Sequence, residues 1–377
     1  MKIIHVPIER VPNRYTSDWV DQFEREFTQS GVEFVTIGGN PCIPINTGSV
    51  LDCFGTNRYK FIQLNILIGM IENGDITQDD VILFADAWFP GLESLFYIRQ
   101  ITGIDFKIAG ILHAGTWDPF DFTSRNGMRN WAQHTELGWL HGLDIIFVAT
   151  QWHKDLIVMN SGDFDETKIF VTGIPFYAKG LREKYLPEID IVKENIVVFP
   201  HRLDAEKQPE KFDRLAKKYP QWRFVKTIEA TPSRDDYFKL LAKSKVMVSF
   251  ARQETFGYST VEAMALGNFV IVPNELSYRE TVRDNFMRYT NERAIPEMLE
   301  TFMANSFLPE YENTLDDWAQ SVPRMIRVLG VKMREAERRR KDLEQFVADE
   351  QIRIEKERQA RKSQRNAQRE ETKVDSE

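Results

Sequence analysis

The stretch that decides the fold is Val246-Met-Val-Ser-Phe-Ala-Arg-Gln-Glu-Thr-Phe-Gly-Tyr-Ser-Thr-Val-Glu-Ala-Met-Ala-Leu-Gly267. Its apolar run Val246–Phe250 predicts a buried strand, a turn with Gly257 follows, and a helix is expected over Ser259–Leu266. A helix N-terminus after a glycine turn offers unpaired backbone N–H groups and partial positive charge, which suit a phosphate or diphosphate. Glu254 and Glu262 add carboxylates, which accept hydrogen bonds from sugar hydroxyls. The stretch therefore predicts a nucleotide-sugar site.

On both sides of this stretch, strand-like apolar runs alternate with helix-like segments. In the first half we expect strands at Lys2–Val6, Glu33–Ile37, Val81–Phe84, Phe106–Leu112, Ile145–Ala149 and Ile169–Val171, and helices at Trp19–Ser30 and Phe61–Ile71. After a polar segment with a proline, Leu181–Lys193, we expect strands at Ile196–Phe199, Arg223–Lys226 and Phe269–Val272, and helices at Pro209–Lys218 and Asp235–Lys243. Such alternation predicts an α/β fold in which helices cover parallel sheets.

The length of 377 residues favours two domains over one. We expect Rossmann-like α/β domains over residues 1–185 and 190–310, with Leu181–Lys193 as the linker. Residues 311–330 should hold a terminal helix, Asp317–Leu329, that packs back on the body. Two such domains leave a cleft between the carboxyl ends of their strands, where ligands of α/β proteins bind.

The composition excludes several classes of protein. Cys42 and Cys53 form neither a disulfide framework nor a metal-binding spacing, and they fit a reducing cytoplasm. The N-terminus is strand-like and unlike a signal peptide, and no stretch approaches the ~18 apolar residues of a transmembrane helix. A net charge of −8 gives no general attraction to nucleic acid or anionic lipid. We therefore expect a cytoplasmic protein.

The C-terminal tail, residues 331–377, differs from the body in composition. It holds 14 Lys/Arg and 12 Asp/Glu, few apolar residues, and neither Gly nor Pro. Such a segment buries little surface, so it should be a solvated charged helix or disordered. An arm that binds nucleic acid or a protein partner is the alternative.

A second charged motif, Phe199-Pro-His-Arg-Leu-Asp-Ala-Glu-Lys207, follows the first strand of the second predicted domain. Arg202 and Lys207 would lie at the carboxyl end of that strand, where they could hold diphosphate oxygens. Together the two motifs resemble those of the retaining GT-B glycosyltransferases, in particular glycosyltransferase family 4, and leave open a bacteriophage-type member. That family typically has G-R-L-x-x-x-K-G at the first motif and E-G-F-G-x-x-x-x-E-A-M-A at the second.

The resemblance implies a role for each matching residue. Glu254 would hold hydroxyls of the donor sugar, and Glu262 would bind the ribose of the nucleotide. Arg202 and Lys207 would neutralise the leaving diphosphate, the main electrostatic contribution to such a transfer. The remaining donor-binding candidates are Thr255, Phe256, Gly257, Tyr258, Ser259 and Thr260, whose backbone amides would meet the diphosphate or the sugar.

The first domain supplies the expected acceptor side. His113, after an apolar strand, matches a cleft histidine of family 4 and is the fourth catalytic candidate beside Glu254, Arg202 and Lys207. Acceptor-side candidates are Arg14, Asp86, Trp88, Trp117 and Asp118, of which the two aspartates come just after predicted strands. The aspartates could orient an acceptor hydroxyl or serve as general base in an inverting enzyme. The tryptophans could stack on sugars or bases, or simply fill the core.

Two positions depart from the family pattern. Family 4 often has a Gly-Gly loop after its first strand, but Pro7–Thr16 contains no glycine, and Arg14 or Asn13 would have to take over its contact with the donor phosphate. His201 replaces the usual glycine before Arg202, so the shape of that loop should also differ.

A metal site is not expected. Asp163-Phe-Asp165 has the D-x-D form of a metal motif but lies in a polar loop far from the donor residues. The sequence therefore favours a metal-independent enzyme without a cofactor. The resemblance implies a retaining transferase that uses a UDP- or GDP-sugar as co-substrate. The acceptor stays open between a glycan, lipid-linked sugar or small molecule and a hydroxymethylated base of phage DNA. A non-catalytic GT-B-like nucleotide-sugar binding protein is the alternative from another class.

Overall fold

The computed structural model describes residues 1–12, 14–40, 44–45, 52–186 and 193–374, with side-chain exposure as far as Ala360 except for Glu312. Asn13, Cys42 and residues 187–192 of the expected linker lie outside the described residues. The chain divides into a unit of residues 1–327, which holds both sheets, and a unit of residues 328–377. The domain boundaries expected near residues 185 and 310 stay a prediction.

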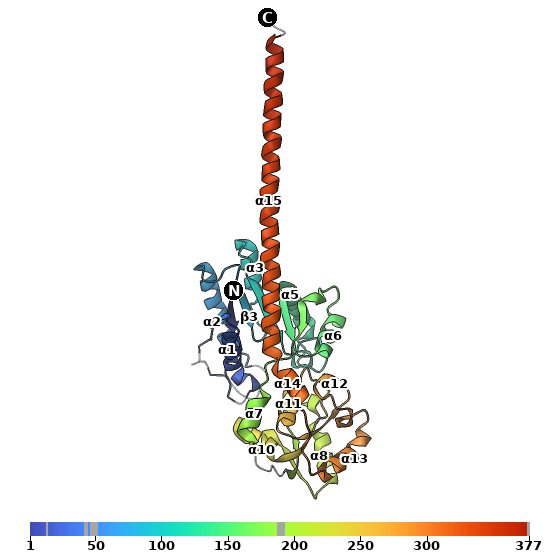
Figure 1. Cartoon of the computed structure of the whole chain (residues 1–377). Helices are drawn as coiled ribbons and strands as arrows, with labels where there is room; N and C mark the ends of the chain where they lie inside the picture. Colours follow the sequence, from blue (N-terminus) through green and yellow to red (C-terminus); the bar gives the residue numbers. More distant parts are fainter. Residues whose placement is uncertain (13, 41–43, 46–51, 187–192, 375–377) are drawn as a thin grey trace. The chain divides into compact units, whose positions relative to one another are not determined.

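The first sheet is built from six parallel strands in the order β2-β1-β3-β4-β5-β6. The strands are β1 (Lys2–Val6), β2 (Glu33–Thr36), β3 (Val81–Phe84), β4 (Lys107–Leu112), β5 (Ile145–Val148) and β6 (Ile169–Val171). Its helices are α1 (Trp19–Gln29), α2 (Gly55–Glu72), α3 (Glu93–Thr102), α4 (Phe122–Arg125), α5 (Arg129–Gly142) and α6 (Gln151–Asn160), with the short 3-10 helices η1 (Tyr15–Asp18) and η2 (Glu166–Lys168) (Figure 1). All four residues of β3 are buried, as expected for a parallel strand covered on both faces.

The second sheet has five parallel strands in the order β11-β10-β9-β7-β8. They are β7 (Glu194–Phe199), β8 (Arg223–Lys226), β9 (Ser244–Val248), β10 (Phe269–Pro273) and β11 (Arg288–Tyr289). The helices are α7 (Ala178–Tyr185), α8 (Pro209–Lys218), α9 (Thr227–Ala230), α10 (Arg234–Lys243), α11 (Tyr258–Ala265), α12 (Tyr278–Thr281) and α13 (Ile295–Ala304), with η3 (Ala205–Lys207), η4 (Asn285–Met287) and η5 (Glu292–Ala294). The predicted α/β fold with two parallel sheets is confirmed.

The expected single terminal helix over Asp317–Leu329 is wrong. The structure has α14 (Glu312–Ala319) and then α15 (Ser321–Val374), so a break falls inside the expected helix. Pro323 lies in the first turn of α15, where a missing N–H costs nothing, and this favours a helix start there. Trp318 and Met325 are buried and the guanidinium of Arg324 reaches the carbonyl of Thr172, so this segment packs onto the end of the first sheet.

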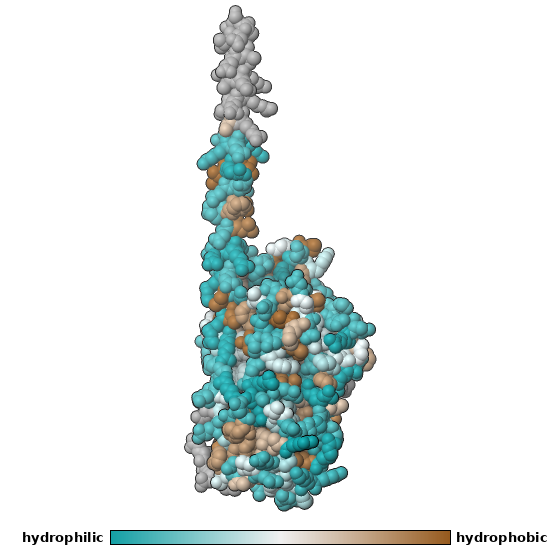
Figure 2. All heavy atoms as spheres, turned by 90° about the vertical axis from the view of Figure 1, so that its right-hand side faces the viewer, coloured by the Kyte–Doolittle hydropathy of each residue, from teal (hydrophilic) through white to brown (hydrophobic). Residues whose placement is uncertain are grey.

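Residues 328–374 of α15 confirm the helical alternative for the tail. Pairs such as Glu337–Lys341 and Arg353–Glu357, four residues apart, stabilise such a helix. Figure 2 shows a mostly hydrophilic surface with separate apolar side chains along this helix. The large apolar residues exposed there include Leu343, Phe346, Val347, Ile352 and Ile354. Among the helices described, none is long and apolar enough to cross a membrane.

Candidate active site

The donor loop, residues 249–257, connects β9 to α11 and turns at Gly257. Gly257 has φ +86°, the left-handed region that glycine adopts without strain, and it directly precedes α11. Its N–H donates to Glu254 Oε1 at 3.0 Å, so the turn itself orients the carboxylate. At the helix start, the N–H groups of Thr260 and Val261 already donate to Gly257 O. Within the described part of the chain this leaves the N–H groups of Tyr258 and Ser259 for an anion.

Lys207 and Glu254 form the charged centre of the site. Lys207 Nζ lies 3.2 Å from Glu254 Oε2, and the two side chains are 7% and 17% exposed. Arg202 pairs with Asp204 at 2.9 Å and with the buried Glu206 at 3.5 Å. Burial, followed by the charges of Lys207 and Arg202, lowers the pKa of His201 well below its usual value. The two cations that the sequence singled out therefore lie close together at the end of β7.

Glu262 is already bound by two side chains that sequence reasoning missed. Arg234 Nη2 donates to its Oε1 at 2.7 Å, and the hydroxyl of Tyr237 donates to its Oε2 at 2.8 Å. Burial raises the pKa of Glu262, and the guanidinium of Arg234 opposes that shift. Arg234 and Tyr237 are three residues apart on one face of α10, a spacing that could have suggested the pair.

Tyr15, also missed from the sequence, connects the two sides of the site. Its ring stacks on Tyr258 with centroids 4.3 Å apart, and its hydroxyl lies 3.0 Å from His113 Nδ1. Burial, then the nearby carboxylates of Asp86 and Glu254, raises the pKa of Tyr15. Tyr15 comes from the segment after β1, where family 4 often has glycines. This chain therefore places an aromatic side chain near the carboxylates of Asp86 and Glu254.

The hydrogen bonds of His113 fix its tautomer. Nε2 lies 2.7 Å from the carbonyl of Ala85, which only accepts, so Nε2 carries the proton. In the neutral ring Nδ1 is then the acceptor, and the hydroxyl of Tyr15 donates to it. Both ring nitrogens are occupied, so the oxygen of Tyr15 is the polar atom that this pair can present to a ligand.

Direct contacts bring the donor loop against the first sheet. Thr255 Oγ1 donates to the carbonyl of His113 at 2.5 Å, and Thr150 Oγ1 donates to the carbonyl of Thr255 at 2.9 Å. Arg125 lies 3.0 Å from Glu206, the carboxylate that also contacts Arg202. The predicted catalytic candidates His113, Glu254, Arg202 and Lys207 therefore meet in one place.

The other donor-binding candidates, in the donor loop and the first turn of α11, have mainly structural contacts. Phe256 is 2% exposed and packs on Trp318, and Thr260 is fully buried. The hydroxyl of Tyr258 accepts from Trp19 Nε1 at 2.9 Å and donates to the carbonyl of Pro175. Ser259 Oγ lies 3.2 Å from His201 Nδ1. For these residues only backbone groups are left to meet a ligand, as the resemblance implies.

On the acceptor side, Asp86 and Asp118 differ in their surroundings. Burial would raise the pKa of Asp86, but Lys60 at 2.9 Å, together with His113, leaves it lowered. Burial raises the pKa of Asp118 to about 6, and Glu254 adds to the shift while Lys207 opposes it. Asp118 Oδ2 is buried without a hydrogen-bond partner in the described structure. Asp118 thus has an oxygen left for a ligand near the charged centre.

The aromatic acceptor candidates lie mostly in the core. Trp117 is 8% exposed, and Trp88 donates its indole N–H to Glu136 at 2.9 Å. Glu136 also accepts from both the N–H and the hydroxyl of Thr116, and burial raises its pKa to about 7. Arg14 pairs with the buried Glu9 at 3.1 Å. Little of the Trp117 ring is therefore exposed to stack on a ligand. Glu136, through its bonds to Thr116, holds the loop that carries Asp118.

Within the described ranges, no group of three or more His, Cys, Asp and Glu side chains could hold a metal ion. Asp165 Oδ1 instead accepts from the N–H and hydroxyl of Thr167 and so caps η2. That local contact gives the D-x-D sequence a structural role.

Residues 204–313 match the family model described as glycosyl transferases group 1. The second sheet therefore carries a glycosyl transferases group 1 segment. With the GT-B fold described next, this segment identifies the chain as a glycosyltransferase. The match begins two residues after Arg202 and includes the whole donor loop, so the predicted resemblance to group 1 glycosyltransferases is confirmed for this segment.

Solved structures similar to this glycosyltransferase show the same GT-B fold. A sucrose-phosphate synthase (tll1590) from Thermosynechococcus elongatus is 13% identical, with 90% of this chain and 99% of that chain covered and a TM-score of 0.57. An alpha,alpha-trehalose-phosphate synthase (UDP-forming) from Burkholderia vietnamiensis is 12% identical, with 89% and 100% covered and a TM-score of 0.57. A trehalose-6-phosphate synthase, OtsA, is 12% identical, with 89% and 99% covered and a TM-score of 0.59. At these identities the likeness establishes the fold alone.

Proposed function

We propose that this glycosyltransferase moves a sugar from a nucleotide diphosphate sugar to an acceptor hydroxyl, with retention and without a metal ion. The observation that carries the proposal is the Lys207–Glu254 pair, 3.2 Å apart. The charges of Glu254 and Arg202 both act on Tyr15, which bonds His113, so these groups belong to one site. A cation and a carboxylate held side by side suit a ligand that joins a phosphate to a polyol.

In the proposed reaction, Arg202 and Lys207 hold the diphosphate and stabilise the negative charge that grows as the bond from sugar C1 to the phosphate oxygen breaks. Charges placed in advance where charge develops supply the largest part of catalysis in many enzymes. The acceptor oxygen forms the new bond to C1 on the same face, and its proton passes to the departing phosphate oxygen. Glu254 orients the sugar through its hydroxyls during this exchange.

Glu262 is proposed to bind the ribose of the donor. Its two oxygens are held by Arg234 and Tyr237, so a ribose must share or replace these bonds. We propose a UDP- or GDP-sugar as donor. One GT-B relative is a UDP-forming synthase and another was solved with UDP-2-fluoro glucose, which favours UDP.

For the acceptor we propose a hydroxyl oriented beside Asp118. A modified base of phage DNA is the competing acceptor, and the net charge of −8 weighs against binding a phosphate backbone. Affinity for hydroxymethylated duplex DNA measured at several salt concentrations separates the two. A steep loss of affinity with salt supports DNA, and no binding at low salt excludes it.

The test of the function is donor-dependent turnover in matched variants. Lys207→Ala and Glu254→Gln should each lower kcat/KM by about 10²–10³-fold, the usual cost of losing one group that stabilises developing charge. Lys226→Ala is the control, because Lys226, the last residue of β8, pairs with Asp213 on α8. Unchanged turnover in both site variants contradicts the proposal. A separate measurement, NMR of the anomeric configuration of the product, decides between retention and inversion.

A further inference from the structure

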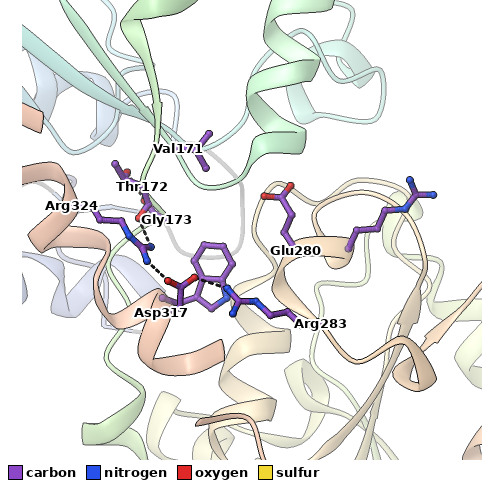
Figure 3. A pocket seen from close by; sticks show the side chains of 9 residues that line it. Val171, Thr172, Gly173, Glu280, Arg283, Asp317 and Arg324 are labelled. Carbon is purple, nitrogen blue, oxygen red and sulfur yellow. Dashed lines mark hydrogen bonds and ion pairs between the residues drawn. The ribbon is translucent and has the colours of Figure 1, made fainter. Parts of the chain in front are cut away.

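A separate cavity of about 310 Å³, which we call the arginine pocket, is lined by residues after β6, by residues 279–283 and by the segment around Asp317 and Arg324 (Figure 3). Thr172 and Gly173 after β6 form one wall, and Arg283 after α12 and Arg324 in the first turn of α15 contribute others. Gly173 has φ +76°, and a Cβ there would lie 3.0 Å from Trp318 Cε3. The close approach of Trp318 to the first sheet therefore depends on this glycine.

The lining of the pocket has an excess of positive charge. It contains Arg279, Arg283 and Arg324 but only two carboxylates, Glu280 and Asp317. Figure 3 shows Arg283 and Arg324 converging on Asp317, which binds one of them through each oxygen. The net charge of the lining is +1, three arginines against two acids.

Neither carboxylate is free to neutralise the third arginine. Both oxygens of Glu280 accept backbone N–H groups of Gln151 and Trp152 at 2.8 Å, where α6 begins. Arg279 has no carboxylate partner among the residues that the structure describes; its Nε donates to the carbonyl of Asn274 at 2.9 Å. Its charge also contributes, after burial, to lowering the pKa of Arg288. An uncompensated guanidinium thus lies at a cavity where two more guanidinium groups are already fixed in place.

Two of the residues around the pocket pack directly against the donor loop. The ring of Trp318 meets that of Phe256 edge to face, with centroids 5.2 Å apart. Tyr278, which precedes Arg279, is fully buried, bonds Ser249 through its hydroxyl at 2.8 Å and lies 3.4 Å from the position of a Cβ on Gly257. A ligand in the pocket would therefore act on the back of the loop that carries Glu254.

We propose that the arginine pocket binds a small phosphate-bearing anion, either inorganic phosphate or a phosphomonoester, and thereby regulates the donor loop. Guanidinium groups match phosphate oxygens in pairs, and the volume is in the lower range for small-molecule sites. The anion would accept bonds from the three arginines and take over part of the role of Asp317. Asp317 thus competes with the anion for the arginines. Its removal should therefore strengthen anion binding, whereas removal of an arginine should weaken it.

The test is a titration of the full chain with inorganic phosphate, read by thermal unfolding at constant ionic strength, because a ligand that binds the folded state raises Tm. All samples carry Lys207→Ala to weaken phosphate binding at the proposed donor site. On this background, Arg279→Gln should weaken phosphate binding about tenfold, as for the loss of one charged hydrogen bond. Asp317→Asn should tighten it, and Arg223→Gln, an exposed arginine on β8, should leave it unchanged.

The same titration with glycerol 3-phosphate identifies the source of the phosphate group. Tighter binding than inorganic phosphate indicates a phosphomonoester, and weaker binding indicates the free anion. The proposal is overturned if Arg279→Gln and Arg223→Gln both keep the parent midpoint, or if potassium chloride alone reproduces the shift.

A second measurement tests regulation in the chain with Lys207 intact. Phosphate should change the donor KM of the wild type by more than that of Arg279→Gln, and equal changes in both overturn regulation through the pocket. Because the titration contains no nucleotide sugar, its failure is distinguishable from failure of the proposed function.

Discussion

Replacing Gly257 with alanine tests whether the donor loop positions Glu254. At φ +86° an alanine is strained by about 1–2 kcal/mol, partly offset by the ~0.4–1 kcal/mol gained from a less flexible unfolded chain. The new Cβ would lie 3.4 Å from both Glu254 Cγ and Tyr278 Cε1, which is ordinary contact and adds little cost. We therefore expect a loss of about 1 kcal/mol, or roughly 1–2 °C in Tm for the unit of residues 1–327.

The effect on turnover should be much larger than the effect on stability. Relief of the strain rotates the N–H of Gly257 away from Glu254 Oε1, now 3.0 Å away, and releases the carboxylate. Misplacement of a substrate-orienting group by about 1 Å costs on the order of 100-fold in rate. Steady-state kinetics and thermal unfolding are measured on the same preparations.

Gly31→Ala is the matched control. Gly31 has φ +72° but nothing within 4 Å of the added Cβ, so it carries a similar backbone strain without touching the site. The two variants should lose similar stability, and only Gly257→Ala should lose turnover. Equal turnover in the two variants would refute the idea that the turn orients Glu254.

Three further predictions concern groups of the first sheet. Tyr15→Phe should lower kcat about tenfold, because the hydroxyl that donates to His113 Nδ1 is lost, while the donor-induced rise in Tm persists; equal losses of both would assign Tyr15 to donor binding. Asp118→Asn should remove an ionisation near pH 6 from the pH profile of kcat/KM, and an unchanged profile would exclude Asp118 from the reaction. The carboxyl of Glu136 has a pKa raised from 4.5 to about 7, so the folded state binds its proton more tightly and stability falls as pH rises from about 4.5 to 7. Glu136→Gln should flatten that part of a plot of Tm against pH, and a slope equal to that of the wild type would contradict the assignment.

The parts of the fold that the sequence predicted best are several of the parallel strands. β1, β3, β6 and β8 begin and end where the apolar runs predict. The tail was harder, because a charged helix lacks the apolar periodicity that distinguishes helix from disorder. Its helix is stabilised by pairs such as Glu337–Lys341, whose formation depends on the helix already being present.

In the site, sequence motifs predicted the charged residues but not their partners. Lys207 and Glu254 belong to recognisable motifs, and the structure brings them together. Tyr15 meets a histidine 98 positions away, and Arg234 reaches a carboxylate 28 positions away. No local pattern encodes such contacts, because they depend on how separate strands and loops are placed in the fold.

Side chains in and next to the donor loop make specific contacts with several separate segments of the chain. Thr255 bonds the carbonyl of His113 and Phe256 packs on Trp318. Tyr258, which follows the loop as the first residue of α11, bonds both Trp19 and Pro175. Each of these side chains joins the loop to a different segment, so the motif serves packing between the sheets as much as ligand binding. Glu254 is different: its contacts are with Lys207 and the turn at Gly257, both inside the proposed site. Loss of turnover without loss of stability should therefore be concentrated at Glu254 and Lys207, because the neighbouring side chains hold the loop in place.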